Sequence, residues 1–242
     1  MTAAPSAADG FQYAGSELEL FQHALNWKAY WACQLVPYVH GKVLDVGAGI
    51  GTNVAALSTS RVTGWTCLEP DGALVETMRA RQANGELPAN CAIRHGTLAS
   101  LASEETFDTI VYIDVMEHIE DDRAEAARAL EHLAAGGRLV LLCPAHQYLF
   151  SPFDAAIGHH RRYNRAGMAA LAPPGVRVDL CRLLDSAGFF ASLANKLLLG
   201  SAQPSAGQIA LWDRVLVPIS RVVDPLVGYR FGKTVIAVFS RP

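Results

Sequence analysis

Closely spaced glycines follow a short apolar run near residue 43. The run at 43–46 leads into Gly47, Gly49 and Gly51, and Glu69 comes about one helix and one strand later. Such a run is typical of a buried strand entering a tight turn, where missing side chains let a ligand approach the backbone. A carboxylate at the tip of the next strand can accept hydrogen bonds from ribose hydroxyls. Together these features predict a nucleoside-cofactor site at this turn.

Histidines in the second half of the chain suggest acid–base chemistry. Histidine suits proton transfer near neutral pH, which accelerates a reaction by about 10²–10⁴-fold. We favour His159 and His160, because they lie on the polar, aromatic segment 146–164 that follows a predicted strand. His118 either takes part in catalysis, or it caps the following turn or bonds the cofactor carboxylate. His146 is a further candidate, and Tyr148 and Tyr163 are secondary proton donors or pocket walls.

Other roles remain open for the same segment. Arg161, Arg162 and Arg165 form a local basic cluster that could bind a phosphate or carboxylate, or simply a solvated face. Alternatively, His159 and His160 fasten the loop to backbone groups while the arginines pair with acids. The chain has no His-x-x-x-His spacing, and adjacent histidines diverge in an extended segment, so we expect no metal.

The elements that must position these residues alternate between strand and helix. This alternation predicts a parallel sheet with helices on both faces and ligands at the carboxyl ends of the strands. We expect strands at 43–46, 63–68, Cys91–His95, Phe107–Ile113, 138–143, 176–184 and Thr234–Ser240. We expect helices at 17–39, at 52–60, at 71–84 with Asp71 as its cap, and at 122–133, where Gly136 and Gly137 stop the last one.

Length, charge and cysteine spacing limit the class of protein. The 242 residues suit a single domain, divided into a tail and helical lid (1–40), a cofactor-binding core (41–144) and an acceptor-side segment with the final strands (145–242). The net charge of −3 leaves no basic footprint, so nucleic acid is not expected as a partner. Five scattered cysteines without a Cys-x-x-Cys pair indicate reduced thiols of a cytoplasmic protein.

The terminal regions bear on secretion and membrane contact. Residues 1–10 lack the basic start and apolar core of a secretion signal, and we expect a mobile tail there. The longest uncharged stretch, 197–212, is interrupted by Gly200, Pro204 and Gly207, which disfavours a membrane span. Apolar segments near Arg214 and Arg221 permit peripheral contact with a bilayer, although core packing explains them too.

Four ordered motifs within residues 43–144 resemble the class I S-adenosylmethionine-dependent methyltransferases. They read Val-Leu-Asp-Val-Gly-Ala-Gly-Ile-Gly, Leu-Glu-Pro-Asp, Phe-Asp-Thr-Ile-Val-Tyr-Ile-Asp-Val-Met-Glu-His-Ile and Gly-Gly-Arg-Leu-Val-Leu. The flanking segments resemble a bacterial small-molecule subgroup associated with envelope-lipid or secondary-metabolite pathways. The resemblance implies an α/β, Rossmann-like, seven-stranded and mostly parallel sheet with helices on both faces, an antiparallel last strand at 233–240 and an N-terminal helical lid.

The resemblance also implies which residues hold the cofactor. The methionine moiety would lie along Gly47, Ala48, Gly49 and Gly51, and Asp45 would order the loop or meet the ammonium group. Glu69 would bind the ribose hydroxyls, and Pro70 would pack against adenine. The methionine and acceptor side would be lined by Asp114, Val115 and His118. One departure concerns the adenine amino group. Family members commonly place an acid after a glycine at the end of the third strand, whereas this chain has Gly96 and Thr97, so backbone groups of Thr97 and Leu98 would hold adenine instead.

The implied function is methyl transfer from S-adenosylmethionine to an oxygen, nitrogen or carbon of a small molecule, with S-adenosylhomocysteine as product. The chain would act as a monomer or homodimer. Two alternatives remain: a catalytically inactive cofactor-binding or scaffolding protein, and an NAD(P)-dependent oxidoreductase. The oxidoreductase is disfavoured because its loop reads Gly-x-Gly-x-x-Gly, whereas Gly51 arrives one residue too early.

Overall fold

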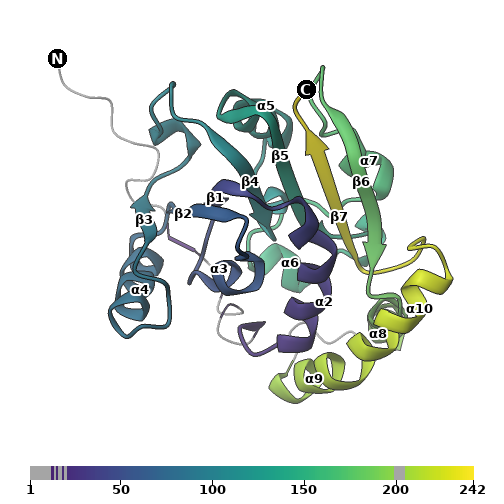
Figure 1. Cartoon of the computed structure of the whole chain (residues 1–242). Coiled ribbons are helices and arrows are strands. Elements are labelled where there is room, and N and C mark those ends of the chain that lie inside the picture. Colours follow the sequence, from purple (N-terminus) through teal and green to yellow (C-terminus); the bar gives the residue numbers. More distant parts are fainter. Residues whose placement is uncertain (1–11, 14, 16–17, 19–20, 199–204) are drawn as a thin grey trace.

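One seven-stranded sheet forms the centre of the molecule (Figure 1). The computed structural model describes residues 12, 13, 15, 18, 21–198 and 205–242, and the predicted N-terminal tail lies outside them. The strands are β1 (Gly41–Val46), β2 (Val62–Glu69), β3 (Cys91–His95), β4 (Phe107–Ile113), β5 (Leu133–Pro144), β6 (Arg177–Leu184) and β7 (Thr234–Ser240). Their order is β3-β2-β1-β4-β5-β7-β6, and β7 runs antiparallel to both of its neighbours. The predicted mostly parallel sheet with an antiparallel last strand is confirmed.

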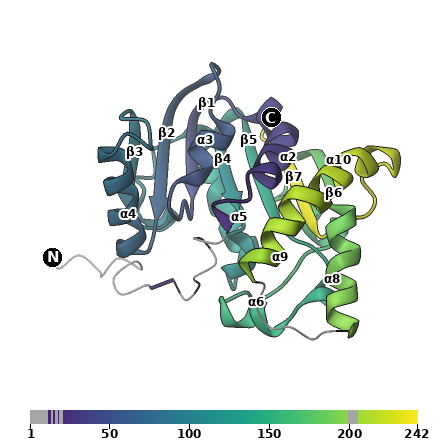
Figure 2. The same ribbon diagram turned by 90° about the horizontal axis from the view of Figure 1, so that it is seen from below.

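Helices cover both faces of this sheet (Figure 2). They are α2 (Leu25–Leu35), α3 (Thr52–Leu57), α4 (Gly72–Ala83), α5 (Asp122–Glu131), α6 (Pro152–Ala156), α7 (Arg165–Ala169), α8 (Ser186–Leu198), α9 (Ala206–Leu211) and α10 (Val217–Leu226). The short turns are η1 (Val36–Tyr38), η2 (Leu98–Ser100), η3 (Met116–His118), η4 (Gln147–Leu149) and the π-helical η5 (Trp212–Leu216). Every helix within residues 21–198 and 205–242 is too short or too polar to cross a bilayer.

The two faces hold separate apolar cores because successive strand residues point in opposite directions. Val111 on β4 packs in the core under α2, α3, α4 and α10, whereas Ile110 and Tyr112 pack in the core under α5 and α7. A strand that is buried on both faces must be apolar throughout. That requirement explains the unbroken apolar runs that predicted β4 and most of β5.

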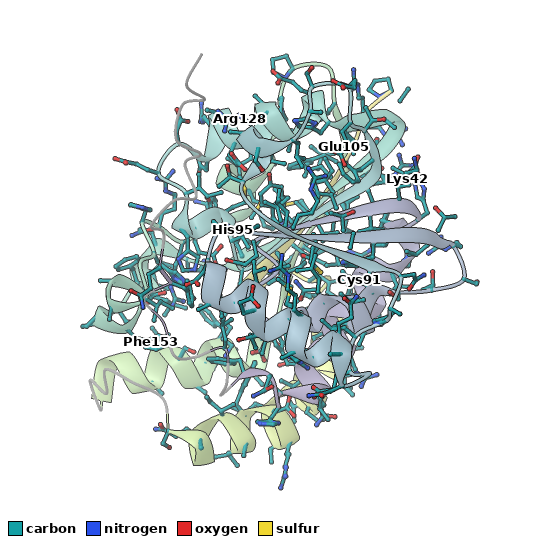
Figure 3. All side chains as sticks on the ribbon, turned by 90° about the vertical axis from the view of Figure 1, so that its left-hand side faces the viewer. Lys42, Cys91, His95, Glu105, Arg128 and Phe153 are labelled. Atoms are coloured by element: carbon teal, nitrogen blue, oxygen red, sulfur yellow. The ribbon has the colours of Figure 1, made fainter. Side chains whose placement is uncertain are left out.

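The carboxyl ends of the parallel strands meet along one edge of the sheet. There β1 runs into the glycine loop, β2 ends at Glu69, and β4 ends at Ile113. Next in the chain, Asp114 has a φ of 55°, which turns the chain sharply into η3. The outermost strand β3 ends at the same edge with His95, whose Nε2 lies 2.9 Å from the carbonyl oxygen of Pro70 (Figure 3). Connections between strands therefore place the polar groups of several motifs together.

Several predicted helix boundaries were wrong. The expected stop at Gly136 and Gly137 lies inside β5: α5 ends at Glu131, and the chain returns to the sheet at Leu133. The two glycines belong to a bulge, because the register of β5 against β4 jumps between Leu133 and Arg138. The helix at 52–60 also ends early, at Leu57.

The expected continuous helix at 17–39 is broken: Leu18 and Phe21 are helical, residues 22 and 23 form a turn, and α2 begins at Leu25. A distant side chain explains this start. The Asp213 carboxylate accepts hydrogen bonds from the backbone amides of Asn26 at 3.3 Å and Trp27 at 2.8 Å. An acidic group at a helix N-terminus satisfies amides that the helix itself leaves unpaired. Sequence periodicity could not show this cap, because Asp213 lies in the C-terminal third.

Candidate functional site

A cavity of about 380 Å³ opens at the carboxyl ends of the strands. This volume is typical of small-molecule sites. Its walls come from the glycine loop, the ends of β2 and β4, the loop before His159, and the N-terminal segment. That last wall includes Tyr13, Leu18, Phe21, Trp27, Lys28 and Trp31. The residues predicted as a lid therefore border the site.

The glycine loop reaches the cavity with three left-handed residues. Gly47, Gly49 and Gly51 have φ values of 65°, 58° and 79°, a region that side chains disfavour. A Cβ added to Gly47 would lie 2.7 Å from a Val115 methyl, so the loop also packs tightly against the turn after β4. Glycine is thus required here by both conformation and space.

Two buried carboxyl groups lie beside this loop. Glu69 accepts hydrogen bonds from the backbone amides of Gly49 at 2.8 Å and Asp71 at 2.9 Å. Asp45 accepts one from Asn53 at 3.2 Å, and its Oδ2 has no hydrogen-bond partner among the described residues. Burial raises the pKa of each carboxyl to about 7, and the neighbouring Glu69 adds to the effect on Asp45. Both groups would gain from a cationic or hydrogen-bond-donating ligand.

The raised pKa of Asp45 leads to a prediction about stability. A carboxyl whose pKa is near 4 in the unfolded chain and about 7 in the folded protein is protonated only in the folded state between these two pH values. Its contribution to the free energy of unfolding is therefore fully present below pH 4 and is lost as the pH rises through 7. The side chain of the Asp45→Asn variant is an amide, which stays uncharged across this pH range. The Tm of Asp45→Asn minus the Tm of the wild type should therefore increase by a few degrees from pH 5.5 to pH 8.5 in thermal melts without ligand. A parallel pH dependence in both proteins would contradict this.

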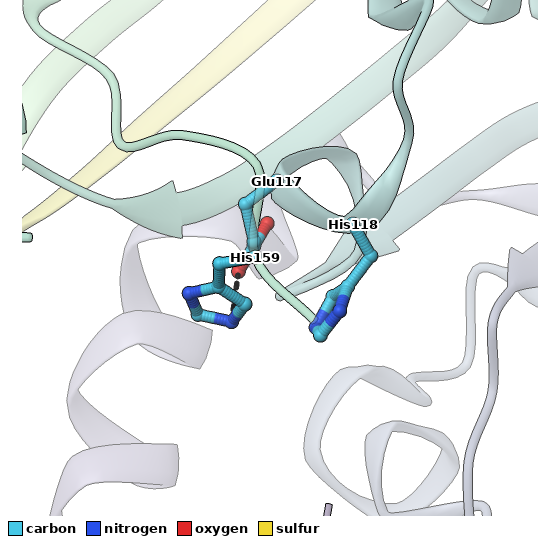
Figure 4. A group of neighbouring side chains, drawn as sticks. All are labelled: Glu117, His118 and His159. Carbon is cyan, nitrogen blue, oxygen red and sulfur yellow. Dashed lines mark ion pairs between the residues drawn. The ribbon is translucent and has the colours of Figure 1, made fainter. Parts of the chain in front are cut away.

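Glu117, His118 and His159 form a compact polar group at the cavity wall (Figure 4). Glu117 and His118 come from η3, whereas His159 follows α6, and one possible ligand atom from each lies within 4.8 Å of the others. Nε2 of His159 is 3.9 Å from Oε1 of Glu117, and the two imidazole centroids are 4.5 Å apart. Glu117 is fully buried, and neither carboxyl oxygen has a hydrogen-bond partner among the described residues.

Burial has opposite effects on the charges in this group. Burial and the neighbouring Asp114 raise the pKa of Glu117 well above its usual range. Burial, reinforced by His159, lowers the pKa of His118 to about 4. The imidazole of His118 is therefore neutral at physiological pH, with a lone pair available.

Asp154 organises the loop that carries His159. Its carboxylate lies 3.0 Å from Nδ1 of His159, pairs with two guanidinium nitrogens of Arg162, and accepts from the Ser151 hydroxyl at 2.7 Å. Burial opposes ionisation, but these hydrogen bonds hold the pKa of Asp154 well below its usual range. Because the ionised Asp154 carboxylate can only accept, Nδ1 of His159 donates to it, and Nε2 is the ring nitrogen that faces Glu117.

The predicted catalytic residues separate into two groups. His118 and His159 line the cavity. His160 is exposed and contributes its backbone amide to the Glu117 carbonyl at 2.8 Å. Tyr163 is buried, and its hydroxyl donates to Asp122 at 2.7 Å, away from the cavity lining.

The predicted cofactor residues also separate. Eight line the cavity: Gly47, Ala48, Gly49, Glu69, Pro70, Asp114, Val115 and His118. Four lie behind that lining: Asp45, Gly51, Thr97 and Leu98. The carbonyl of Thr97 accepts from the Ser100 hydroxyl at 2.6 Å, and Leu98 is buried in the core.

Arginines of the basic cluster act mainly as clamps. Arg161 pairs with Asp122 at 2.9 Å, and Arg162 pairs with Asp154 at 2.8 Å. This is the alternative in which the arginines pair with acids and fasten the loop. Arg162 nevertheless borders the cavity.

Sequence reasoning missed several cavity residues. Glu117 was adjacent to a chosen histidine, and its position in the Asp-Val-Met-Glu-His motif was the available signal. Asp154 and Lys233 gave no local signal. The Lys233 ammonium lies 3.5 Å from Asp185 and 3.9 Å from the centre of the Trp212 ring, and both Lys233 and Trp212 line the cavity.

Comparisons with known proteins agree with this geometry. Residues 44–139 match a family model described as a methyltransferase domain. The polyketide synthase ThaQ of Burkholderia thailandensis is 30% identical over 105 residues, which make up 42% of this chain and 5% of that protein. This chain thus spans only a small part of that relative.

Solved structures share the fold across almost the whole chain. The [4+2]-cyclase SpnF superposes with a TM-score of 0.63 at 14% identity, covering 100% of this chain and 98% of that one. Coclaurine N-methyltransferase, bound to N-methylheliamine and S-adenosylhomocysteine, superposes with a TM-score of 0.60 at 13% identity, covering 90% and 72%. At these identities the likeness shows the fold alone, and the cyclase illustrates that one fold hosts different activities.

Proposed function

We propose that the protein methylates a small molecule, because residues 44–139 match the methyltransferase-domain model and carry motifs that resemble those of the class I S-adenosylmethionine-dependent methyltransferases. The observation that carries the proposal is the left-handed glycine loop, whose Gly49 amide donates to Glu69 at the mouth of the cavity. This arrangement lies within the residues that match the family model. The resemblance stated from the motifs alone is thereby confirmed at the level of the family.

The residues present fit S-adenosylmethionine. Glu69 and Asp45 offer buried carboxyl oxygens to ribose hydroxyls and to the region of the ammonium, and one Asp45 oxygen has no partner among the described residues. Gly47, Gly49 and Ala48 would lie along the methionine moiety, and Pro70 beside adenine. When bound, this cofactor supplies a methyl group already activated by a sulfonium.

The protein's own task is to align an acceptor atom and exclude water. Trp27 and Trp31 are nearly buried and line the cavity, so they provide an apolar wall. On the opposite side, His118 and His159 offer imidazole nitrogens close to that space. Of the four proposed catalytic residues, His118 and His159 are the two that line the cavity, which supports a role for them in holding or accepting a proton from an acceptor hydroxyl.

Calorimetric titration of the purified protein tests the proposal. We expect micromolar binding of S-adenosylmethionine and S-adenosylhomocysteine and no binding of NADH. Binding of NADH alone would favour the oxidoreductase, and binding of neither by a folded protein would overturn the proposal. Cofactor binding, with no radiolabelled methyl transferred to any of a diverse set of small hydroxyl and amine acceptors, would favour the inactive cofactor-binding alternative.

An exposed apolar stripe supports peripheral contact with an anionic bilayer. The stripe lies on one face of α9, η5 and α10 and consists of Leu211, Val215, Ile219, Val222 and Leu226. Exposed Arg214, Arg221 and Arg230 on the same segment form no ion pair with a described acid. An apolar face flanked by cations is typical of helices that lie in a membrane interface.

Flotation with anionic vesicles tests this contact. We expect the wild type to float with phosphatidylglycerol vesicles, and Val222→Glu combined with Leu226→Glu to stay in the soluble fraction. A wild type that does not float would contradict the proposal. The cytoplasmic location and the monomeric or homodimeric state stay predictions.

A further inference from the structure

Glu117 has an environment that the fold does not explain. Its carboxyl is fully buried, and neither oxygen has a partner at hydrogen-bond geometry among the described residues; the polar group on its inner side is the buried Cys143 thiol, a weak donor. Buried polar groups in proteins are almost always paired, because an unpaired one loses its interactions with water without compensation. Such a side chain, aimed at a cavity wall, indicates a missing partner.

Two imidazoles surround that carboxyl. Nε2 of His159 is 3.9 Å from Oε1 of Glu117, and His118 lies beside both within the same 4.8 Å group (Figure 4). A separation of 3.9 Å is too long for a hydrogen bond. It is compatible with two ligands of one ion, because metal-to-ligand distances are about 2.0–2.2 Å.

The surroundings hold these imidazoles as metal ligands are usually held. Asp154 lies 3.0 Å from Nδ1 of His159 and is itself fixed by Arg162 and Ser151, so Nε2 is the nitrogen left to ligate. On the other ring, a Cβ built on Gly158 would be 3.7 Å from Nδ1 of His118, which shows how closely this backbone approaches. A carboxylate behind a ligating histidine is a recurrent outer-shell arrangement.

We propose that Glu117, His118 and His159 bind one divalent transition-metal ion at the acceptor side of the cavity. Two imidazoles and one carboxylate favour zinc, cobalt, manganese or iron over magnesium or calcium, which prefer oxygen ligands. Three protein ligands leave positions open toward the cavity, as in catalytic metal sites. The expectation of no metal was based on spacing along the chain, whereas these ligands converge only after folding.

The ion would orient the acceptor, a role that depends on the proposed function, whereas ion binding does not. With the ion bound, the two imidazoles would serve as its ligands in place of accepting a proton, so an acceptor hydroxyl bound to the ion would release its proton to solvent, and its oxygen would then attack the methyl carbon. An oxygen–carbon bond forms as the sulfur–carbon bond breaks, and the electron pair of the broken bond stays on sulfur. The products are the methyl ether and S-adenosylhomocysteine.

Cobalt absorption and zinc calorimetry on chelator-treated, full-length protein test the site. We expect one equivalent of Co²⁺ to give visible absorption bands that Zn²⁺ abolishes. Glu117→Gln, His118→Ala and His159→Ala should each weaken zinc binding by at least ~100-fold, and Asp154→Asn by about 10–100-fold. His160→Ala removes the adjacent exposed histidine and should bind as the wild type does.

The outcomes separate the two proposals. No stoichiometric ion, or equal binding by His159→Ala and His160→Ala, would overturn the metal site. Titration with S-adenosylhomocysteine in the absence of metal reports on the methyltransferase proposal alone. Retained binding in Glu117→Gln would also show that this variant folds, so that its loss of zinc reflects the ligand. Zinc binding without S-adenosylhomocysteine binding would support the ion site and count against methyl transfer.

Discussion

Replacing Glu69 with alanine is expected to weaken S-adenosylhomocysteine binding by about 100-fold or more. Hydrogen bonds to a charged group contribute about 1.5–3 kcal/mol each, and tenfold in affinity corresponds to about 1.4 kcal/mol. A ribose offers two hydroxyls, and Glu69 lies at the cavity with both carboxyl oxygens held by backbone amides. Isothermal titration measures the change.

Two further variants separate ligand contact from loop structure. Glu69→Gln keeps one acceptor oxygen for the amides of Gly49 and Asp71, so its affinity should fall between those of the wild type and the alanine variant. Glu76→Ala removes an exposed glutamate of α4 whose ion pair among the described residues is with the exposed Arg79, and it should bind normally. Unchanged affinity in Glu69→Ala would remove this residue from the cofactor site.

Gly49→Arg is expected to abolish cofactor binding in a protein that still folds. A Cβ at Gly49 would be 3.6 Å from a Leu18 methyl, which is ordinary contact, so the backbone can accept a side chain apart from strain at its φ of 58°. That strain costs roughly 1–2 kcal/mol. The remainder of the arginine side chain would fill the space beside the loop, where the cofactor should lie.

Gly85→Arg is the matched control. Gly85 also has a left-handed φ, 78°, but nothing lies within 4 Å of its added Cβ, and it does not line the cavity. Both variants should lose similar stability in thermal melts, whereas only Gly49→Arg should lose binding in calorimetry. Equal affinities for the two variants would argue against a cofactor along this loop.

The fold was largely predictable because it depends on local patterns. Three of its strands, at Cys91–His95, Phe107–Ile113 and Thr234–Ser240, were expected at their observed bounds. Asp71 also caps α4 as expected, by accepting from the amides of Ala73 and Leu74. The bulge at Gly136 was not predictable, since a glycine pair after a helix reads equally as a stop or as an irregular strand. The start of α2 depends on Asp213, a contact between distant parts of the chain.

The site was predictable on the cofactor side and less so on the acceptor side. Glycine spacing and the carboxylate after β2 have direct physical reasons that a sequence displays. The partners of His159 do not: Asp154 and Glu117 reach it through the fold, and its neighbour His160 points to solvent. Candidates that are adjacent in sequence thus received opposite environments, which no property of the two histidines themselves could distinguish.

The position of β7 sets the order in which the molecule can be completed during synthesis. Because β7 follows β6 in the chain but lies between β5 and β6 in the sheet, β6 can join the other strands only after β7 has been synthesised. The aromatic helix α2 likewise precedes the Asp213 carboxylate that caps it by 186 residues. A nascent chain that ends before residue 240 must therefore hold an unfinished pocket with an open sheet edge. Ribosome-bound intermediates should be the form of this protein most dependent on chaperones.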